Sequence, residues 1–366
     1  MKMSIKSKSD AHYLFSKKTL AFISLLFVIT LFSSPLILGA NGYVPPPQVV
    51  VKSEAELRNA ISTASEDKVY LIGIEKDISL KKPLEIPNGK IISLKVSGAR
   101  LVGSDGMDAV IIKNGGILTV LGSLTITHAK SASGRGVYVE RGGEFNFYGG
   151  EISGNSATKG GGVYNEGTFT MFWDGSAGDT EICGNTATEG GGGVYNVGTF
   201  EMVGGRIRGN SCVGQGGFVG VGGGVYNEGT FEMSGYGEFE ERLGSVISGN
   251  TATKGGGVYN VGVFTQKGVS KIFDNTATVE GRDVYNLDVF KGHDDGDVDI
   301  FSDMTTNGED KTVSIKDKDG SQFYLLTIIG LIVIAGVVGV FLFFYRVRRR
   351  NSLMVKSLGD SVGEVT

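Results

Sequence analysis

Gly161-Gly-Val-Tyr-Asn165 decides the fold of this chain, because nearly the same residues return at regular intervals. The valines of the full and fainter copies are Val137, Val163, Val194, Val225, Val258 and Val284. Their successive spacings are therefore 26, 31, 31, 33 and 26 residues, a period that is typical of solenoid proteins.

Two further motifs repeat in step with the first one. An Ile-x-Gly-Asn pattern, with Asp in place of Gly in the last copy, ends at Asn155, Asn185, Asn210, Asn250 and Asn275. A Gly-Thr-Phe-x-Met pattern has its aromatic residue at Phe169, Phe200 and Phe231. Each repeat therefore holds three short segments with alternating apolar residues, separated by Gly and Asn, which predict three strands and three turns.

Strands this short cannot complete a sheet within one repeat, so each must pair with its counterpart in the next repeat. This pairing predicts a parallel β-helix, an all-β solenoid in which equivalent side chains form ladders along the axis. The asparagines of the Ile-x-Gly-Asn motif are expected at corners, with left-handed backbone and with amides that hydrogen-bond from coil to coil. The predicted inward ladders are Val163/Val194/Val225/Val258, Phe169/Phe200/Phe231/Phe264 and Ile182/Ile207/Ile247/Ile272.

The repeats resemble those of the polymorphic outer membrane proteins, a group of β-helical adhesins marked by alternating GG-[A/V/L]-[I/V/Y] and F-x-x-N motifs. GGGVYN and I-x-G-N stand in those places here, with Ile in place of Phe, from Val137 to Asn286. The resemblance implies a right-handed parallel β-helix at a cell surface, and it is more specific for fold than for function. Those proteins end in an outer-membrane β-barrel, whereas this chain is expected to end in a transmembrane helix.

Composition places the chain among turn-rich repeat proteins. Its 366 residues include 59 Gly and 6 Pro, which is typical neither of a disordered chain nor of an ordinary globular domain. The formal net charge is -4, and the one dense basic run, Arg346–Arg350, directly follows an apolar segment. The sequence has no basic footprint of the kind that nucleic-acid binding requires, so no such partner is predicted.

The N-terminal part of the sequence predicts a targeting segment and a cap. Residues 1–40 are predicted to be a signal peptide, or an anchor if uncleaved, because lysines precede the apolar run Leu20–Leu38. Residues 41–67 are predicted to hold a linker and a short capping helix, since Ser53-Glu-Ala-Glu56 matches a capping box. This helix is expected to cover the open edge of the first coil of a β-helix that occupies 68–287.

The C-terminal part predicts a membrane anchor. An acidic stalk is expected at 288–321, a transmembrane helix at 322–345 and a cytoplasmic tail at 346–366. The run Phe323–Tyr345 carries no charge and is long enough to cross a bilayer, and Arg346–Arg350 follows it as a stop-transfer signal. The positive-inside rule then predicts a protein of the plasma membrane or cell surface, with an extracellular ectodomain and a cytoplasmic C-terminus.

Three insertions break the regular coil; one of them, Val213–Val221, leaves a different corner, and the other two predict a ligand-binding edge. They interrupt the coil after Phe169 and after Phe231, at the same turn two coils apart, so both loops should protrude on one edge. Aromatic residues beside acidic ones on such loops could contact an extracellular glycan or a surface protein. The alternative is that Trp173 and Phe239 fold back to cover the coil edge. The candidate residues are Phe172, Trp173, Asp174, Tyr236 and Phe239.

A stripe of tyrosines forms a second candidate surface. A tyrosine follows each ladder valine, and it must point outward if the valine points inward. An exposed stripe would be a partner surface, whereas the alternative is that the stacked rings only stabilise the sheet. The stripe consists of Tyr164, Tyr195, Tyr226 and Tyr259, with Tyr138 and Tyr285 at its ends.

No cofactor is predicted, and the one candidate metal site lies in the acidic stalk. Cys212 replaces a small alanine of the repeat and is expected to be buried, whereas Cys183 takes an outward position. The two are offset along adjacent coils, so no disulfide is expected. Four carboxylates could bind calcium, although their spacing is not that of an EF-hand loop: Asp294, Asp295, Asp297 and Asp299.

The sequence favours a binding or structural role over catalysis. Acid pairs are expected only at Asp174/Asp179 and Asp294/Asp295, and neither pair falls on a strand face. The histidines form no constellation for a metal or a nucleophile. We therefore predict an adhesin-like or structural surface rod that is not an enzyme. The alternative is a membrane-tethered polysaccharide lyase or glycoside hydrolase with a β-helix fold.

Overall fold

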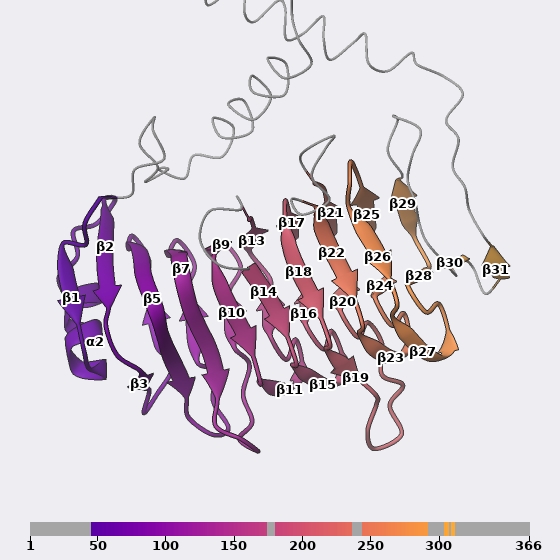
Figure 1. Ribbon diagram of the computed structural model, residues 1–366, viewed down its shortest axis with the longest axis horizontal. Coiled ribbons are helices and arrows are strands. Elements are labelled where there is room, and N and C mark those ends of the chain that lie inside the picture. The colour runs from indigo at the N-terminus through magenta and orange to yellow at the C-terminus, as the bar shows by residue number, and fades with distance from the viewer. Residues whose placement is uncertain (1–44, 174–179, 236–243, 292–303, 307–308, 312–366) are drawn as a thin grey trace, which may run out of the picture. The chain divides into compact units, whose positions relative to one another are not determined.

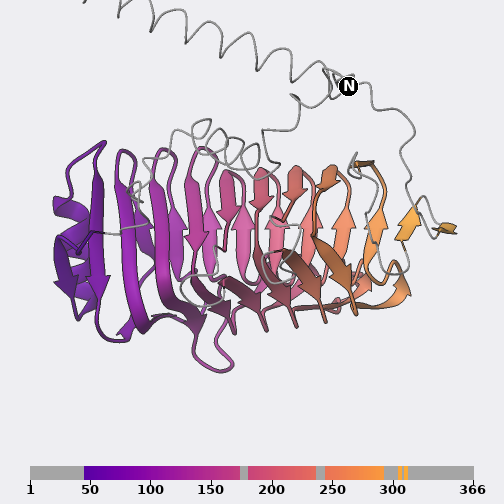
Figure 2. The same ribbon diagram turned by 45° about the horizontal axis from the view of Figure 1, so that its top comes forward.

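The computed structural model describes residues 45–173, 180–235, 244–291, 304–306 and 309–311 (Figure 1). This part of the chain is mostly β structure with one helix, and its strands pair in parallel apart from one antiparallel pair near the end. Neighbouring strands within a sheet come from consecutive repeats. The chain therefore winds into a curled, solenoid-like structure that is compatible with a parallel β-helix. Figure 2 shows the strands of successive coils side by side.

The largest sheet, here called the two-armed sheet, receives two strands from each regular coil. The first arm comprises β9 (Glu144–Tyr148), β13 (Thr168–Met171), β17 (Thr199–Met202), β21 (Thr230–Met233), β25 (Val263–Gln266) and β29 (Val289–Lys291). The second arm comprises β10 (Gly150–Ser153), β14 (Thr180–Cys183), β18 (Gly205–Arg208), β22 (Ser245–Ser248) and β26 (Lys271–Phe273). The N-terminal strands are β1 (Val49–Val51), β2 (Val69–Ile74), β3 (Ile78–Ser79), β5 (Ile91–Gly103) and β7 (Ile117–His128), of which β7 pairs with both arms.

Two smaller sheets complete each coil. The Val-Tyr-Asn sheet comprises β4 (Leu84–Ile86), β6 (Val110–Ile112), β8 (Val137–Val139), β12 (Val163–Asn165), β16 (Val194–Asn196), β20 (Val225–Asn227), β24 (Val258–Asn260), β28 (Val284–Asn286), β30 (Met304–Thr306) and β31 (Glu309–Lys311). The Thr-Ala-Thr sheet comprises β11 (Ser156–Lys159), β15 (Thr186–Gly190), β19 (Ser211–Cys212), β23 (Thr251–Lys254) and β27 (Thr276–Glu280).

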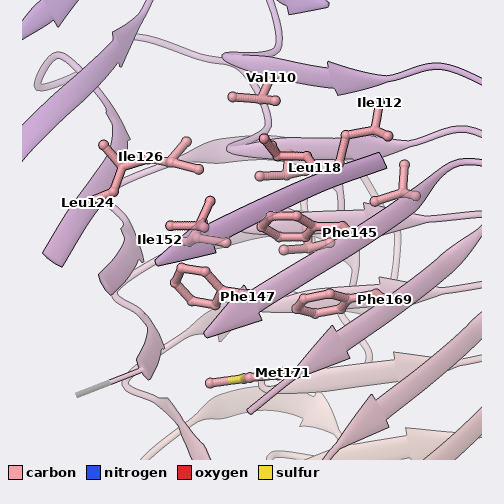
Figure 3. Close-up of a cluster of buried hydrophobic side chains, with 14 of the residues drawn as sticks. Val110, Ile112, Leu118, Leu124, Ile126, Phe145, Phe147, Ile152, Phe169 and Met171 are labelled. Atoms are coloured by element: carbon pink, nitrogen blue, oxygen red, sulfur yellow. The ribbon is translucent and has the colours of Figure 1, made fainter. Parts of the chain in front are cut away.

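The inward ladders are confirmed. Every valine, phenylalanine and isoleucine of the predicted ladders is buried, and each pairs in register with its equivalent in the next coil. The rings of Phe169, Phe200, Phe231 and Phe264 stack with centroids 4.6, 4.7 and 4.9 Å apart. Figure 3 shows the same interior in earlier coils, where Phe145 and Phe147 lie among aliphatic side chains. The core is therefore a set of continuous columns, which explains why the period is so visible in the sequence.

The asparagines of the Ile-x-Gly-Asn motif form the expected amide ladder. Asn185 Nδ2 donates to Asn210 Oδ1, and Asn210 Nδ2 donates to Asn250 Oδ1, both at 3.0 Å. The backbone N–H of Asn185 also donates to Asn210 Oδ1 at 3.0 Å. Because a backbone N–H can only donate, these bonds fix which end of each buried amide faces which neighbour.

The expected left-handed backbone of these asparagines was wrong. The left-handed residue is the one before each asparagine, for example Gly184 with a φ of 62° and Asp274 with a φ of 54°. The asparagine instead turns its side chain inward, where Asn185 Nδ2 also donates to the carbonyl of Ile152 at 2.8 Å. Glycine takes the left-handed position because it lacks the Cβ that disfavours it.

A second amide ladder, which sequence reasoning missed, lies in the Val-Tyr-Asn sheet. The asparagine of each motif is buried and donates to its equivalent in the next coil at 2.6 to 2.7 Å. The donors and acceptors are Asn165, Asn196, Asn227, Asn260 and Asn286. Each coil therefore contributes two buried amides whose partners lie in the neighbouring coils.

A helix covers the N-terminal end of the solenoid. In α2 (Glu54–Thr63), Ser53 Oγ accepts from the backbone N–H of Glu56 at 3.3 Å, as in a capping box. The Glu56 carboxylate accepts from the backbone N–H of Lys52 at 2.7 Å instead of that of Ser53. Leu57, Ala60 and Ile61 are buried on one face of α2. Strand β1, which lies where a linker was expected, adds to this end by pairing with β2.

The amide ladder ends within the chain at both sides. At its start, His128 Nδ1 lies 2.8 Å from Asn155 Oδ1. At its end, Asp283 Oδ1 accepts from the backbone N–H and Nδ2 of Asn275, at 3.1 and 2.9 Å. Asp283 occupies the position of Gly257 in the preceding coil, where an added Cβ would lie 2.9 Å from Asn275 Nδ2. Among the described residues no further asparagine follows Asn275 in the ladder, and the Asp283 side chain takes that place.

The predicted targeting and anchoring segments are outside the described residues. These are the signal segment 1–40, the transmembrane helix 322–345 and the tail 346–366. Within the described residues, no helix is long and apolar enough to cross a membrane. The expected acidic stalk contains β29, β30 and β31, so strand pairing continues further than predicted from the loss of the repeat.

Replacing Asp283 tests the end of the ladder. Asp283→Ala leaves the buried backbone N–H of Asn275 without its acceptor, and an unsatisfied buried group costs about 1–3 kcal/mol. Asn275 Nδ2 keeps the carbonyls of Ile247 and Phe273 as acceptors. We expect the midpoint of thermal unfolding, followed by circular dichroism, to fall clearly in Asp283→Ala. Asp283→Asn keeps an acceptor oxygen and is the matched control. Equal midpoints for Asp283→Ala and the wild type would contradict this role.

Candidate functional site

Both insertion loops leave the two-armed sheet at the bend between its arms. The first loop connects β13 to β14 and the second connects β21 to β22, whereas β17 between them passes to β18 through Val203 and Gly204 alone. The expected position of the loops, at the same turn two coils apart, is confirmed. Asp174, Tyr236 and Phe239 lie outside the described residues, so Phe172 and Trp173 are the candidate ligand-binding residues that can be placed.

Phe172 and Trp173 pack against neighbouring coils at this bend. The ring of Phe172 meets Tyr148 of the preceding coil edge-on, with centroids 5.6 Å apart. The Arg206 guanidinium of the next coil lies 5.9 Å from the centroid of the Trp173 ring. Both aromatic side chains are half-buried. For Trp173 this arrangement fits the alternative that it covers the coil edge, and ligand contact by these residues stays a prediction.

Two carboxylates lie side by side on the outer face of the first arm. Glu201 of β17 and Glu232 of β21 are direct partners on adjacent parallel strands. Glu232 forms an ion pair with Lys267 at 2.8 Å. Burial raises the pKa of the Glu201 carboxyl, the negative charge of Glu232 raises it further, and Lys267 opposes the shift. The Glu201 carboxyl is thus biased toward its protonated form, while Glu232 is ion-paired with Lys267.

The expectation that no acid pair lies on a strand face was wrong. Sequence reasoning looked for acids close together in the chain, but Glu201 and Glu232 become neighbours only when their coils stack. The available signal was the Thr-Phe-Glu-Met motif, which occurs in two consecutive repeats. Adjacent strands lie about 4.8 Å apart, so equivalent outward residues of consecutive repeats are always neighbours.

A polar group lies on β9 of the same arm, separated from this pair by strand β13. Asn146 Nδ2 donates to Glu144 at 2.7 Å, and the Tyr148 hydroxyl donates to Asn146 Oδ1 at 3.5 Å. Burial raises the pKa of Tyr148 to about 12, with added effects from the charges of Glu144 and Glu201. The tyrosine therefore remains a hydrogen-bond donor at neutral pH. The first arm thus presents aromatic rings, an amide and carboxylates along one outer face.

Ion pairs also form within the second arm. Glu181 is buried between Arg206, at 3.5 Å, and Arg208, at 2.7 Å. Cys183 Sγ donates to Glu151 at 3.5 Å, and burial followed by the charges of Glu151 and Glu181 raises the thiol pKa to about 12. This thiol is therefore protonated and a poor nucleophile at neutral pH.

The two cysteines occupy the positions expected from the repeat. Cys183 pairs in register with Arg208 on the outer face, and Cys212 pairs with Ala187 and is buried. Both are free thiols. Burial raises the pKa of the Cys212 thiol to about 11, so it is also protonated at neutral pH.

The tyrosine stripe is outward-facing but less exposed than predicted. Tyr195 is only 3% exposed and Tyr285 6%, while Tyr138, Tyr164, Tyr226 and Tyr259 are half-buried. Consecutive rings from Tyr164 to Tyr285 are stacked, and Lys159, near Tyr195, covers part of the stripe. This geometry fits the alternative that stacking stabilises the sheet face.

No metal site can be assigned within the part of the chain that the structure describes, where potential ligands do not gather in groups of three or more. The candidate calcium ligands Asp294, Asp295, Asp297 and Asp299 lie outside that part. The acid pairs Asp174/Asp179 and Asp294/Asp295 lie outside it as well. The calcium site therefore stays a prediction.

Comparisons with known proteins identify no relative of this chain. No protein-family model, no curated protein and no solved structure matches the chain. The likeness to the polymorphic outer membrane proteins therefore rests on the repeated motifs alone.

The shifted pKa of Glu201 predicts a pH-dependent effect on stability. A carboxyl whose pKa is raised by folding contributes most favourably below its ordinary pKa of 4.5, and this contribution is lost as the pH rises through the raised value. Glu201→Gln should therefore raise the unfolding midpoint at pH 7 and leave it nearly unchanged at pH 3. The comparison variant Glu232→Gln removes the ion pair with Lys267 and should not raise the unfolding midpoint of the protein. A lower unfolding midpoint for Glu201→Gln than for the wild type at pH 7 would contradict the raised pKa of Glu201.

Proposed function

We propose that this protein is a membrane-anchored, cell-surface β-helix repeat protein of adhesin type, with a right-handed coil. In this proposal the signal segment 1–40 directs export and the helix 322–345 anchors the chain. The solenoid is then a rod outside the cell, and the tail 346–366 is cytoplasmic. The extracellular partner is a glycan or a surface protein, bound at the bend of the two-armed sheet.

The observation that carries this proposal is that the insertions after β13 and β21 leave one bend of a stacked scaffold. Inward positions of the coils are occupied by apolar and asparagine ladders, so groups available to a partner must come from outer faces and loops. At the bend these groups are the rings of Tyr148, Phe172 and Trp173, with Glu201 and Glu232 on the neighbouring face. Loops held by a rigid scaffold are frequent binding sites.

A second candidate function, the hydrolysis or elimination of glycans, is favoured by the Glu201 and Glu232 pair. Adjacent strands separate equivalent residues by about 4.8 Å, close to the carboxyl spacing of about 5–5.5 Å in retaining glycosidases. Glu201 has the raised pKa of an acid, whereas Glu232 forms an ion pair with Lys267. We place this candidate second because the ion pair with Lys267 occupies the carboxylate that would have to act as nucleophile.

A panel of plant, wall and host polysaccharides tests both candidates on the purified full-length chain. We expect binding without release of new sugar ends, with and without calcium. Binding should weaken by about tenfold or more in Trp173→Ala, as for a buried aromatic contact worth about 1.4 kcal/mol or more. Val50→Ala, an exposed change at the far end of the solenoid, is the matched control.

Release of sugar ends that disappears in Glu201→Gln would replace the adhesive function with the enzymatic one. Absence of binding to every glycan and to intact cells would contradict the adhesive function.

The proposed topology is tested separately on intact cells that make the full-length chain with a C-terminal tag. External protease should remove epitopes within 45–311 and leave the tagged tail protected until the cells are opened. This outcome follows from export of the solenoid and retention of the basic run Arg346–Arg350 on the inner side. A protected solenoid in intact cells would contradict the surface location.

A further inference from the structure

The outward tyrosines form a continuous row of rings along the Val-Tyr-Asn sheet, stacked from Tyr164 to Tyr285. Successive centroids from Tyr138 to Tyr285 lie 5.5, 5.1, 4.5, 5.4 and 4.9 Å apart. The shortest separation joins Tyr195 and Tyr226, whose ring planes differ by 25°. These two residues are also direct partners on adjacent strands. The pair is thus held together by the backbone pairing of β16 and β20 as well as by stacking.

Both hydroxyls of this pair share one acceptor atom. Tyr195 donates to Glu228 Oε1 at 2.7 Å, and Tyr226 donates to the same oxygen at 3.1 Å. Glu228 is exposed, so it can exchange a proton with water. The two phenol oxygens therefore lie on the same side of the stack, beside one carboxylate.

The shared carboxylate occurs only in some coils. The position two residues after each tyrosine from Tyr138 to Tyr285 is, in successive repeats, Glu140, Glu166, Val197, Glu228, Val261 and Leu287. Tyr259 and Tyr285 stack at 4.9 Å with planes 12° apart, but Leu287 replaces the acid there. Tyr138 and Tyr164 have Glu166 nearby, yet their rings meet edge-on at 70°. Tyr195 and Tyr226 therefore combine a close stack with a shared base.

This arrangement controls how the pair can lose electrons. Burial raises the pKa of both phenols, and Glu228 raises it further, so both remain protonated at neutral pH. Removing an electron from a protonated phenol makes it strongly acidic, and the proton must leave with the electron. The Glu228 carboxylate, within hydrogen-bond distance of both hydroxyls, is positioned to take that proton.

We propose that Tyr195 and Tyr226 form an oxidative cross-linking site, which one-electron oxidants convert to a dityrosine that joins consecutive coils. Each phenol gives one electron to the oxidant and one proton through Glu228 to water, leaving two neutral tyrosyl radicals. The radicals combine by a carbon–carbon bond between ring positions next to the hydroxyls. The hydrogen on each bonded carbon then moves to a phenol oxygen and restores both hydroxyls. In total, two electrons and two protons leave the pair.

Such a bond would add a covalent link to a sheet that is otherwise held by hydrogen bonds and stacking. Tyr195 and Tyr226 belong to different coils, so their coupling closes a loop of the chain between them. A cross-link of this kind restricts the unfolded chain and stabilises the folded one in the same way as a disulfide. The chain itself uses no disulfide for this purpose among its cysteines, both of which are free.

The test uses the full-length chain and photogenerated tris(bipyridine)ruthenium(III), with persulfate to regenerate it. Dityrosine fluorescence and mass spectrometry of the cross-linked peptides report the product. We expect the peptide that joins Tyr195 to Tyr226 to form within the monomer, and Tyr226→Phe to abolish it. Glu228→Gln keeps the shape but lacks the base, and should reduce the yield on the order of tenfold or more.

Leu287→Glu provides the matched gain of function. Leu287 is 43% exposed, so the change is compatible with folding, and it places a carboxylate beside the stacked Tyr259 and Tyr285. A new cross-link between these two tyrosines is expected in this variant alone. Circular dichroism confirms that each variant is folded. An undiminished cross-link of Tyr195 to Tyr226 in Glu228→Gln, or a wild-type product that joins only other tyrosines, would overturn the proposal.

Discussion

Pairing of each strand with its counterpart one coil later is the interaction on which the whole structure depends. The strands are two to five residues long in the regular coils, too short to be stable on their own. Once the backbones pair in register, every side chain is placed against its own equivalent. Phenylalanine then stacks on phenylalanine and asparagine bonds to asparagine, and each such match reinforces the same register. The fold is thus stabilised by repetition more than by any single contact.

Because the ladders fill the interior of the coils, the groups that can contact a partner lie on the outer faces and loops. Equivalent outward residues also become neighbours, which turns a repeated Glu into a carboxylate pair and a repeated Tyr into a ring stack. The chemistry of a face therefore depends on which residue departs from the repeat and where. At the bend of the two-armed sheet, residues that differ from the repeat lie beside the insertions after β13 and β21. On the second arm, Glu181 forms ion pairs with two arginines.

The inward ladders could be predicted because they follow from the period alone, once valine and phenylalanine return at the same phase. The pairing of Glu201 with Glu232 was missed because these residues are far apart in the sequence and become neighbours only when their coils stack. The left-handed residue was placed one position too late, because both Gly and Asn tolerate that backbone and the pattern alone does not distinguish them. Asp283 was not recognised as an end of the ladder, because its partner Asn275 lies in a different motif.

The amide ladder that begins at Asn155 has an electrical consequence. Every amide in it points the same way, with its oxygen toward the preceding coil and its nitrogen toward the next. The small dipoles therefore add along the axis, as peptide dipoles do in an α-helix. The negative end of this line lies 2.8 Å from Nδ1 of His128, and its positive end meets the carboxylate of Asp283. A row of neutral side chains thus behaves as a buried macrodipole, and the chain places the Asp283 carboxylate at its positive pole.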